Sequence, residues 1–225
     1  TNNISLKGVR LGLLDSKNSN PQVIELHKKL KEIVNSLGGA VILINDDRDY
    51  PVDAESYVLL YEFRVGLEEY LKNANSSMKK LTDIIDFNNA NKDIVMQYFG
   101  QDIFYNSIKS TSYLKYFWSK YKIYKSYDST KDLIDKYDLD AFIGLTRGPA
   151  WKINYDGGDY AAMNNTLEFG SGGYAAHNGM PHITIPYFEI NKFPVGISII
   201  GDRWTDKTII GYASAIEKSR YNLNF

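Results

Sequence analysis

Hydrophobic positions open the chain in a strand, a helix and a second strand. Residues 9–14 (VRLGLL) are a short apolar run, and apolar residues then recur at helical spacing over residues 23–37. Asn20 and Pro21, just before this helix, are typical of a helix start. Two glycines end the helix, and residues 40–44 (AVILI) are typical of a buried strand. This close succession predicts a parallel strand pair in an α/β sheet.

The middle of the chain has a helical pattern, and the last third returns to strands. Residues 51–138 are mostly amphipathic and predict several helices. The pattern then predicts a strand, a glycine-rich loop, two strands and a closing helix, over residues 140–145, 146–173, 182–186, 194–201 and about 205–219. Because no segment marks a linker, we expect one domain over residues 1–225, a mixed or parallel β-sheet flanked by α-helices.

Composition and charge narrow the classes of partner. The 225 residues are 44% hydrophobic and 14% aromatic, enough for a sizeable core. Lysine and arginine (26) balance aspartate and glutamate (27), which gives no reason to expect nucleic acid or an anionic membrane as partner. No apolar run approaches the roughly 20 residues that span a bilayer. The lack of cysteine excludes disulfides and thiolate metal sites, fits a reducing compartment, and leads us to expect a cytoplasmic protein.

Ser171 stands between glycines in the string FGSGGYAAHNGMPHITIP, where a nucleophilic serine is one interpretation. The nucleophile-elbow pattern G-x-S-x-G fails, because position 169 is phenylalanine. The alternative is a glycine-rich turn whose serine caps a helix from about Tyr174, and the pattern favours this alternative.

The three histidines do not have the spacing of a metal site. His27 falls in an amphipathic helix, whereas His177 and His182 are separated by a Gly-Met-Pro break and do not share a helix face. No H-E-x-x-H or similar spacing occurs. We expect no metal and no cofactor.

Residues 113–127 (YLKYFWSKYKIYKSY) interleave four lysines with aromatic residues. Such a mixture can bind single-stranded nucleic acid. However, Leu114, Phe117, Trp118 and Tyr121 fall at i, i+3, i+4 and i+7, the spacing of one helix face. The pattern therefore favours a helix with its aromatic stripe in the core and its lysines in solvent.

The loop after the strand at 140–145 is the best candidate for a binding site. Loops at the carboxyl ends of strands line the ligand crevice of α/β sheets. Here a tryptophan could form a pocket wall, and an arginine or an aspartate could orient a polar group. The other interpretation, an ordinary surface loop, stays open. The substrate-pocket candidates are Thr146, Arg147, Gly148, Trp151, Gly158 and Asp159, with Ser171 nearby in the sequence.

Several strings, in their order along the chain, resemble a known enzyme family. They include YEFRVGLEEYL, YFGQDIF, LDAFIGLTRGPAW, AAHNGMPHITIP and FPVGISIIG. Together they resemble the carboxyl-terminal half of the amidase signature family, most of all its peptide-amidase-like branch, over about residues 6–220. The resemblance implies a partial amidase-signature fold, a mixed sheet flanked by helices, with the loop candidates over a substrate cleft.

The resemblance also implies which chemistry is missing. The family hydrolyses linear amides with a lysine, a serine in a cis peptide and a nucleophilic serine. All three come from the amino-terminal half, where the serines lie in strings such as GGSSGG. No such string occurs here, so the resemblance assigns no catalytic residue to this chain. We expect a carboxyl-terminal amidase fragment, inactive alone, whose partners in the complete enzyme are the amino-terminal half and a linear amide or peptide amide substrate.

One further expectation follows from the fragment hypothesis. Without the other half, an apolar surface or an unpaired strand edge is left, which favours self-association or local disorder. The alternative to the fragment is a non-enzymatic module that binds a small ligand or a partner protein through the cleft of the amidase fold.

Overall fold

The computed structural model describes residues 5–46, 48, 50–158 and 170–222, without the side chains of residues 221 and 222. The chain divides into two compact units. A sheet unit comprises residues 1–49, 126–151 and 166–225, and a helical unit comprises residues 50–125 and 152–165. The single domain expected from the sequence stays a prediction.

The sheet unit is built on a five-stranded mixed sheet with the strand order β2-β1-β3-β5-β4. Its strands are β1 (Arg10–Leu13), β2 (Ala40–Leu43), β3 (Ala141–Leu145), β4 (His182–Ile190) and β5 (Phe193–Gly201). β1 pairs in parallel with β2 and β3, whereas β5 pairs antiparallel with β3 and β4. The parallel pair and the mixed sheet predicted from the sequence are both confirmed.

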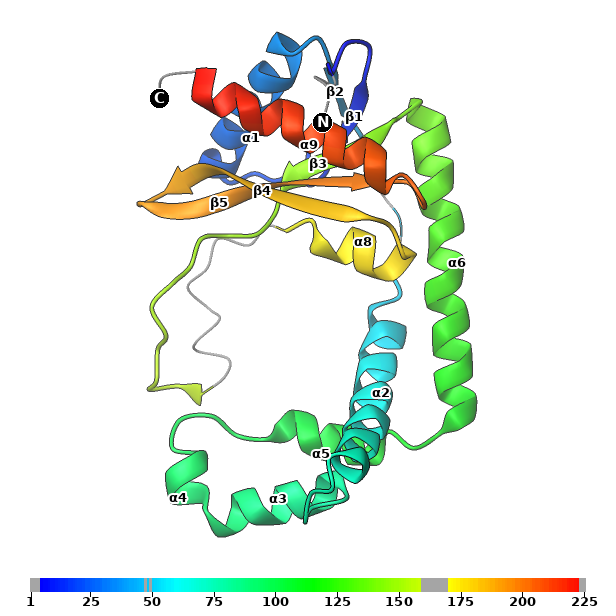
Figure 1. Ribbon diagram of the computed structural model, residues 1–225, viewed down its shortest axis with the longest axis vertical. Coiled ribbons are helices and arrows are strands. Elements are labelled where there is room, and N and C mark those ends of the chain that lie inside the picture. The colour runs from blue at the N-terminus through cyan, green and yellow to red at the C-terminus, as the bar shows by residue number, and fades with distance from the viewer. Residues whose placement is uncertain (1–4, 47, 49, 159–169, 223–225) are drawn as a thin grey trace. The chain divides into compact units, whose positions relative to one another are not determined.

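Helices cover both faces of this sheet. Helices α1 (Pro21–Ser36) and α9 (Asp206–Asn222) lie on one face, and α8 (Gly172–Asn178) lies on the other (Figure 1). The first face shares a hydrophobic core with α1 and α9. On the second face, Phe142 and Ile200 pack with residues of α8 and of the carboxyl-terminal part of α6 (Tyr113–Tyr137). The result is three layers in the α/β class.

Helix α1 begins and ends where local chemistry predicts. The Asn20 side chain accepts a 2.9 Å hydrogen bond from the Gln22 backbone N–H, which satisfies a helix donor that would otherwise lack a partner. Pro21 occupies the first turn, where its missing N–H costs nothing. Gly38 follows the helix at φ +86°, a left-handed conformation that glycine adopts without strain.

Polar contacts tie α6 to the end of β5 within the sheet unit. The Tyr127 hydroxyl donates to Oδ1 of Asp202 over 2.5 Å, and the Arg203 guanidinium lies 3.7 Å from the Tyr127 ring centroid. Burial, with the hydrogen bond to Asp202, raises the pKa of Tyr127 to about 12. The phenol therefore stays protonated and keeps donating across the neutral pH range. The next residue, Trp204, points into solvent with 93% of its surface exposed.

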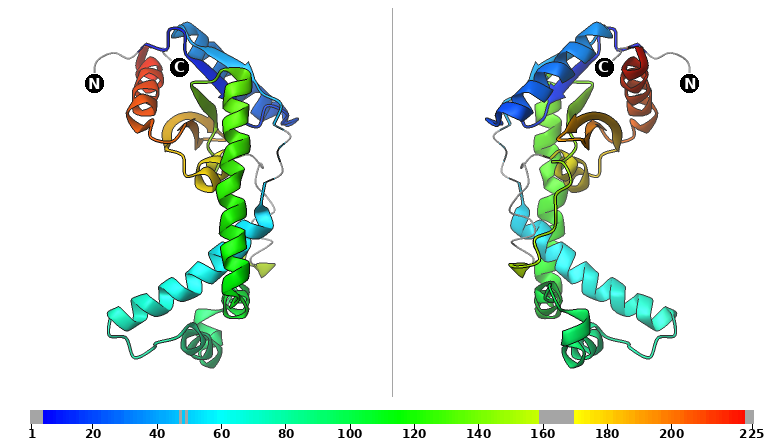
Figure 2. Two further views of the ribbon diagram at one scale, coloured as in Figure 1. Left: turned by 90° about the vertical axis from the view of Figure 1, so that its right-hand side faces the viewer. Right: turned by 90° about the vertical axis from the view of Figure 1, so that its left-hand side faces the viewer.

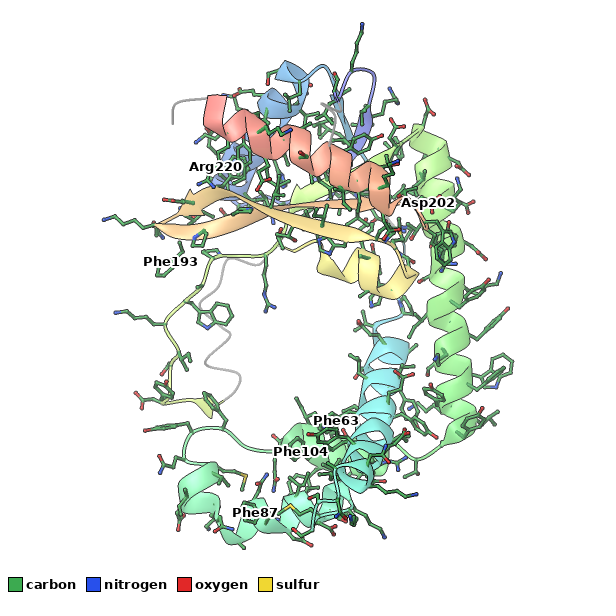
Figure 3. All side chains as sticks on the ribbon, in the orientation of Figure 1. Phe63, Phe87, Phe104, Phe193, Asp202 and Arg220 are labelled. Atoms are coloured by element: carbon green, nitrogen blue, oxygen red, sulfur yellow. The ribbon has the colours of Figure 1, made fainter. Side chains whose placement is uncertain are left out.

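The helical unit contains α2 (Val52–Asn73), α3 (Leu81–Ala90), α4 (Lys92–Val95), α5 (Asp102–Lys109) and the first half of α6, which is one continuous helix (Figure 2). Phe63 and Phe104 stack at 5.6 Å between ring centroids and join α2 to α5 (Figure 3). Tyr61 and Tyr116 stack at 4.3 Å and join α2 to α6. The helices predicted for this stretch are confirmed.

The aromatic stripe of α6 is not in a core, and the sequence prediction on this point was wrong. Leu114 is 68% exposed, and Phe117 and Trp118 are each 53% exposed. Tyr121 is also exposed. The helical periodicity was interpreted correctly, but a periodic apolar face buries itself only where another element covers it. Within the helical unit, the described residues leave this stripe largely in solvent.

Candidate functional site

The loop that leaves β3 is fixed to the sheet by its backbone. The N–H of Thr146 donates to the carbonyl oxygen of Gly196 on β5 over 2.8 Å, and the carbonyl oxygen of Thr146 accepts from the N–H of Ser171 over 3.1 Å. Arg147 forms an isolated antiparallel bridge with Gly170. The first two residues of the predicted pocket loop are therefore brought next to the segment that enters α8.

Ser171 lies at the start of α8 but does not cap it with its side chain. It occupies the N-cap position, yet its side chain makes no capping hydrogen bond, so the predicted capping role is wrong in this respect. The hydroxyl donates instead to the carbonyl oxygen of Leu145 over 2.8 Å, and the residue is only 1% exposed. A nucleophilic serine needs a base to take its proton, whereas this proton is directed at a backbone carbonyl.

The Thr146 hydroxyl belongs to a small cluster of hydroxyl groups and one imidazole. The Ser198 hydroxyl donates to Oγ1 of Thr146 over 2.9 Å, and Nε2 of His182 lies 2.7 Å from the Ser198 oxygen. Thr184 is a weaker neighbour, 3.4 Å from His182 and 3.5 Å from Thr146. Burial lowers the pKa of His182, because the charged imidazolium loses hydration there. The cluster holds the Thr146 side chain against β4 and β5.

Glycines make room for these close approaches. A Cβ at Gly144 would lie 2.6 Å from the Ser171 hydroxyl oxygen. A Cβ at Gly196 would lie 2.7 Å from a methyl carbon of Thr184 and 2.8 Å from Oγ1 of Thr146. β3 and β5 thus have glycine at the positions where the side chains of Ser171 and Thr146 pack against the sheet.

A hollow with a mixed polar and apolar lining opens at the carboxyl ends of the parallel strands β1 and β2. Its volume is about 370 Å³. It is lined by Leu13, Leu14, Asp15, Ser16, Lys17, Ile44, Asp46, Gly170 and Tyr174. Ligand sites in α/β sheets lie at this end of the strands. Gly170 joins the hollow to the segment that contains Ser171.

Charged groups near this hollow are paired rather than isolated. Arg48 forms an ion pair with Asp46 at 2.7 Å, contacts the Thr130 hydroxyl, and places its guanidinium 4.8 Å from the Tyr174 ring centroid. Asn18 donates to Asp15 over 2.7 Å. These contacts hold the two strand-end loops in place beside the hollow.

The structure brings some of the predicted pocket residues together and separates others. Thr146, Arg147, Gly148 and Trp151 follow β3 in the sheet unit, and the first two lie beside Gly170 and Ser171. Gly158 falls in the helical unit, with φ +68°. Asp159 lies outside the described residues. That these seven residues form a substrate pocket stays a prediction.

Sequence reasoning missed the residues that line the hollow. Asp15 and Lys17 follow β1 in the string LLDSK, and Asp46 follows β2 in the string INDD. The rule applied to the loop after β3, that ligands bind beyond the carboxyl ends of strands, points equally to these two loops. The position of these two loops, directly after a predicted strand, was the signal that could have found them.

No group of three or more histidine, cysteine or acidic side chains within the described ranges is placed to hold a metal ion. The described helices also include none that is long and apolar enough to cross a bilayer.

Solved structures supply the comparison that identifies the fold. PAM12A matches 96% of this chain at 26% identity with a TM-score of 0.82. The peptide amidase PAM in complex with the competitive inhibitor chymostatin matches 95% at 27% identity and 0.81. The native peptide amidase from Stenotrophomonas maltophilia matches 96% at 25% identity and 0.79. The fold is that of the amidase signature family.

This amidase fold is incomplete relative to those structures. The chain spans 44% of the length of each of these three proteins. The resemblance to a carboxyl-terminal half, and to the peptide-amidase-like branch, is thereby confirmed. No protein-family model matches the sequence, and no curated protein matches it either.

The lowered pKa values of two histidines predict how the free energy of unfolding depends on pH. Burial lowers the pKa of His27, although Asp15 acts in the opposite direction, and burial also lowers the pKa of His182. Below about pH 6.5 the unfolded chain binds protons at these sites more readily than the folded chain. The free energy of unfolding is therefore expected to fall as pH drops from 7 towards 5.

Urea denaturation at several pH values checks this expectation. The double variant His27→Gln, His182→Gln is expected to lose less stability than the original chain between pH 7 and pH 5. Equal losses in the two proteins would contradict the assignment to these histidines.

Proposed function

We propose that this chain is the carboxyl-terminal part of an amidase-type hydrolase that acts on linear amide C–N bonds. The supporting observation is the match to peptide amidases over nearly all of this chain but under half of theirs. In this proposal the Ser-Ser-Lys chemistry comes from the other half of the enzyme, and the present chain contributes a wall of the substrate cleft.

The loop after β3 is the wall we propose. Thr146 and Ser171 are held to the sheet by backbone and hydroxyl hydrogen bonds, while Arg147 is exposed. A rigid support with an exposed guanidinium suits the orientation of a carbonyl or carboxylate of a peptide amide, because the guanidinium offers several donors in a fixed geometry. The attacking serine is not among these residues.

An amide-hydrolysis assay on the purified 225-residue chain tests the proposal. With a carboxyl-terminally amidated peptide as substrate, we expect no ammonia release above the buffer blank, because nucleophilic catalysis needs the serine and base of the other half. Turnover that is lost in Ser171→Ala would overturn the proposal.

The coding sequence upstream of Thr1 provides a second test of the proposed function. An in-frame lysine and a GGSSGG string there, together with amide hydrolysis by the extended chain, would support the hydrolase. A start codon at the boundary, with no separate chain that restores hydrolysis, would favour the non-enzymatic binding module instead.

A further inference from the structure

The helical unit has a hollow of its own between α2, α5 and α6. Its volume is about 650 Å³, within the range of small-molecule sites. Each of the three helices contributes one side to it, and every lining residue belongs to the helical unit. Neither the family resemblance nor the proposed hydrolase accounts for this hollow.

The charged residues that line this hollow are mostly positive. Three lysines line it, Lys109 at the end of α5 and Lys115 and Lys122 on α6, against a single acidic residue, Asp53 of α2. The ammonium group of Lys115 lies 4.3 Å from the ring centroid of Tyr57, a contact that orients the cation without neutralising it. A concave surface lined by one sign of charge concentrates ligands of the opposite sign.

Two aromatic side chains, Tyr57 and Trp118, line the hollow, and each contacts other residues of the helical unit. Trp118 lines the hollow and makes edge-to-face contacts with its neighbours on α6, with ring centroids 5.8 Å from Phe117 and 5.9 Å from Tyr121. The Tyr57 hydroxyl accepts from the N–H of Ser112 over 2.9 Å and lies 3.2 Å from that residue's carbonyl oxygen. Such preset walls reduce the ordering cost of binding.

We propose that this hollow binds a small organic anion, a planar ring that carries a phosphate or carboxylate group. The ring packs on Trp118, and the anionic group lies among Lys109, Lys115 and Lys122. A small molecule fits the observations better than a nucleic acid strand, because the three lysines all line one hollow of about 650 Å³. Lys120, on another side of α6, is already paired with Glu62 at 3.4 Å.

Isothermal titration calorimetry on the full chain at low ionic strength tests this proposal, with adenosine monophosphate as the probe. We expect one site per chain, and binding at least about tenfold weaker for adenosine and for inorganic phosphate, because each lacks one of the two contacts. Benzene-1,3,5-tricarboxylate, in a parallel titration, distinguishes a carboxylate ligand from a phosphate ligand, and binding of either ring-bearing anion supports the site.

Variants locate the site. Lys115→Gln and Lys122→Gln are each expected to weaken binding of the better ring-bearing anion about tenfold, since each removes a charged donor. Both lysines are exposed, so the variants should fold, which circular dichroism checks. Lys136→Gln on the same helix makes the same charge change away from the hollow and should bind like the original chain.

Three results would overturn the proposal. The first is no binding of either ring-bearing anion at millimolar concentration. The second is binding that Lys115→Gln and Lys122→Gln leave unchanged. The third is inorganic phosphate or a short oligothymidylate binding more tightly than both ring-bearing anions, which would indicate a simple anion site or a nucleic acid surface. None of these measurements depends on amide hydrolysis, so the hydrolase proposal stands or fails separately.

Discussion

Replacing Phe142 by alanine is expected to lower the free energy of unfolding of the sheet unit by about 3–5 kcal/mol. Phe142 is fully buried near the middle of β3, on the sheet face that packs against α8 and α6. Its ring lies 5.3 Å from that of Tyr174, between centroids. Alanine would leave a cavity that this packed layer cannot fill.

Urea denaturation followed by far-ultraviolet circular dichroism measures the loss. Phe193→Ala is the matched control, because Phe193 begins β5, the neighbour of β3 in the sheet, and is 46% exposed (Figure 3). Its substitution should cost about 1 kcal/mol or less, since little buried volume is removed. Equal losses of unfolding free energy at the two positions would contradict the conclusion that Phe142 lies in the core between the sheet, α8 and α6.

Adding one methyl group at Gly144 is expected to cost about 1–3 kcal/mol. A Cβ there would lie 2.6 Å from Oγ of Ser171 and 3.0 Å from Cβ of Leu14. The Ser171 hydroxyl cannot move aside freely, because it donates to the carbonyl oxygen of Leu145. Gly144→Ala should therefore displace the start of α8 or break this hydrogen bond.

A double-mutant cycle separates this clash from other effects. Ser171→Gly removes the hydroxyl, so Gly144→Ala should cost less in that background than alone. Gly173→Ala is the control, since no heavy atom outside its chain neighbours and its own helix backbone lies within 4 Å of the added carbon. Additive losses for the Gly144 and Ser171 changes would show that the two residues do not meet.

The start of the fold could be predicted from the sequence because its signals are local. Asn20, Pro21 and Gly38 act through their own backbone and near neighbours, so their types alone determine where α1 begins and ends. Strand ends were less predictable. β4 was expected to end at Pro186, but it continues to Ile190 through a shift in register between Pro186 and Phe188, an irregularity at which a strand accepts proline.

What the sequence could not supply depends on neighbours that are distant along the chain. The aromatic face of α6 was expected in a core, yet periodicity shows only that a face is apolar and not whether another element covers it. The partner of the Ser171 hydroxyl, the carbonyl oxygen of Leu145, is 26 residues away. The strand-end loops of Asp15 and Asp46 converge only because β1 and β2 pair in parallel.

The tryptophans determine what intrinsic fluorescence can report. Trp204 is almost entirely in water and Trp118 is more than half exposed, so much of the native emission should already resemble that of hydrated indole. Unfolding should then shift the emission maximum little, even when the sheet melts. Conversely, a ring stacked on Trp118 should quench part of this signal, and Trp118→Phe would identify that part, because the other two indoles remain.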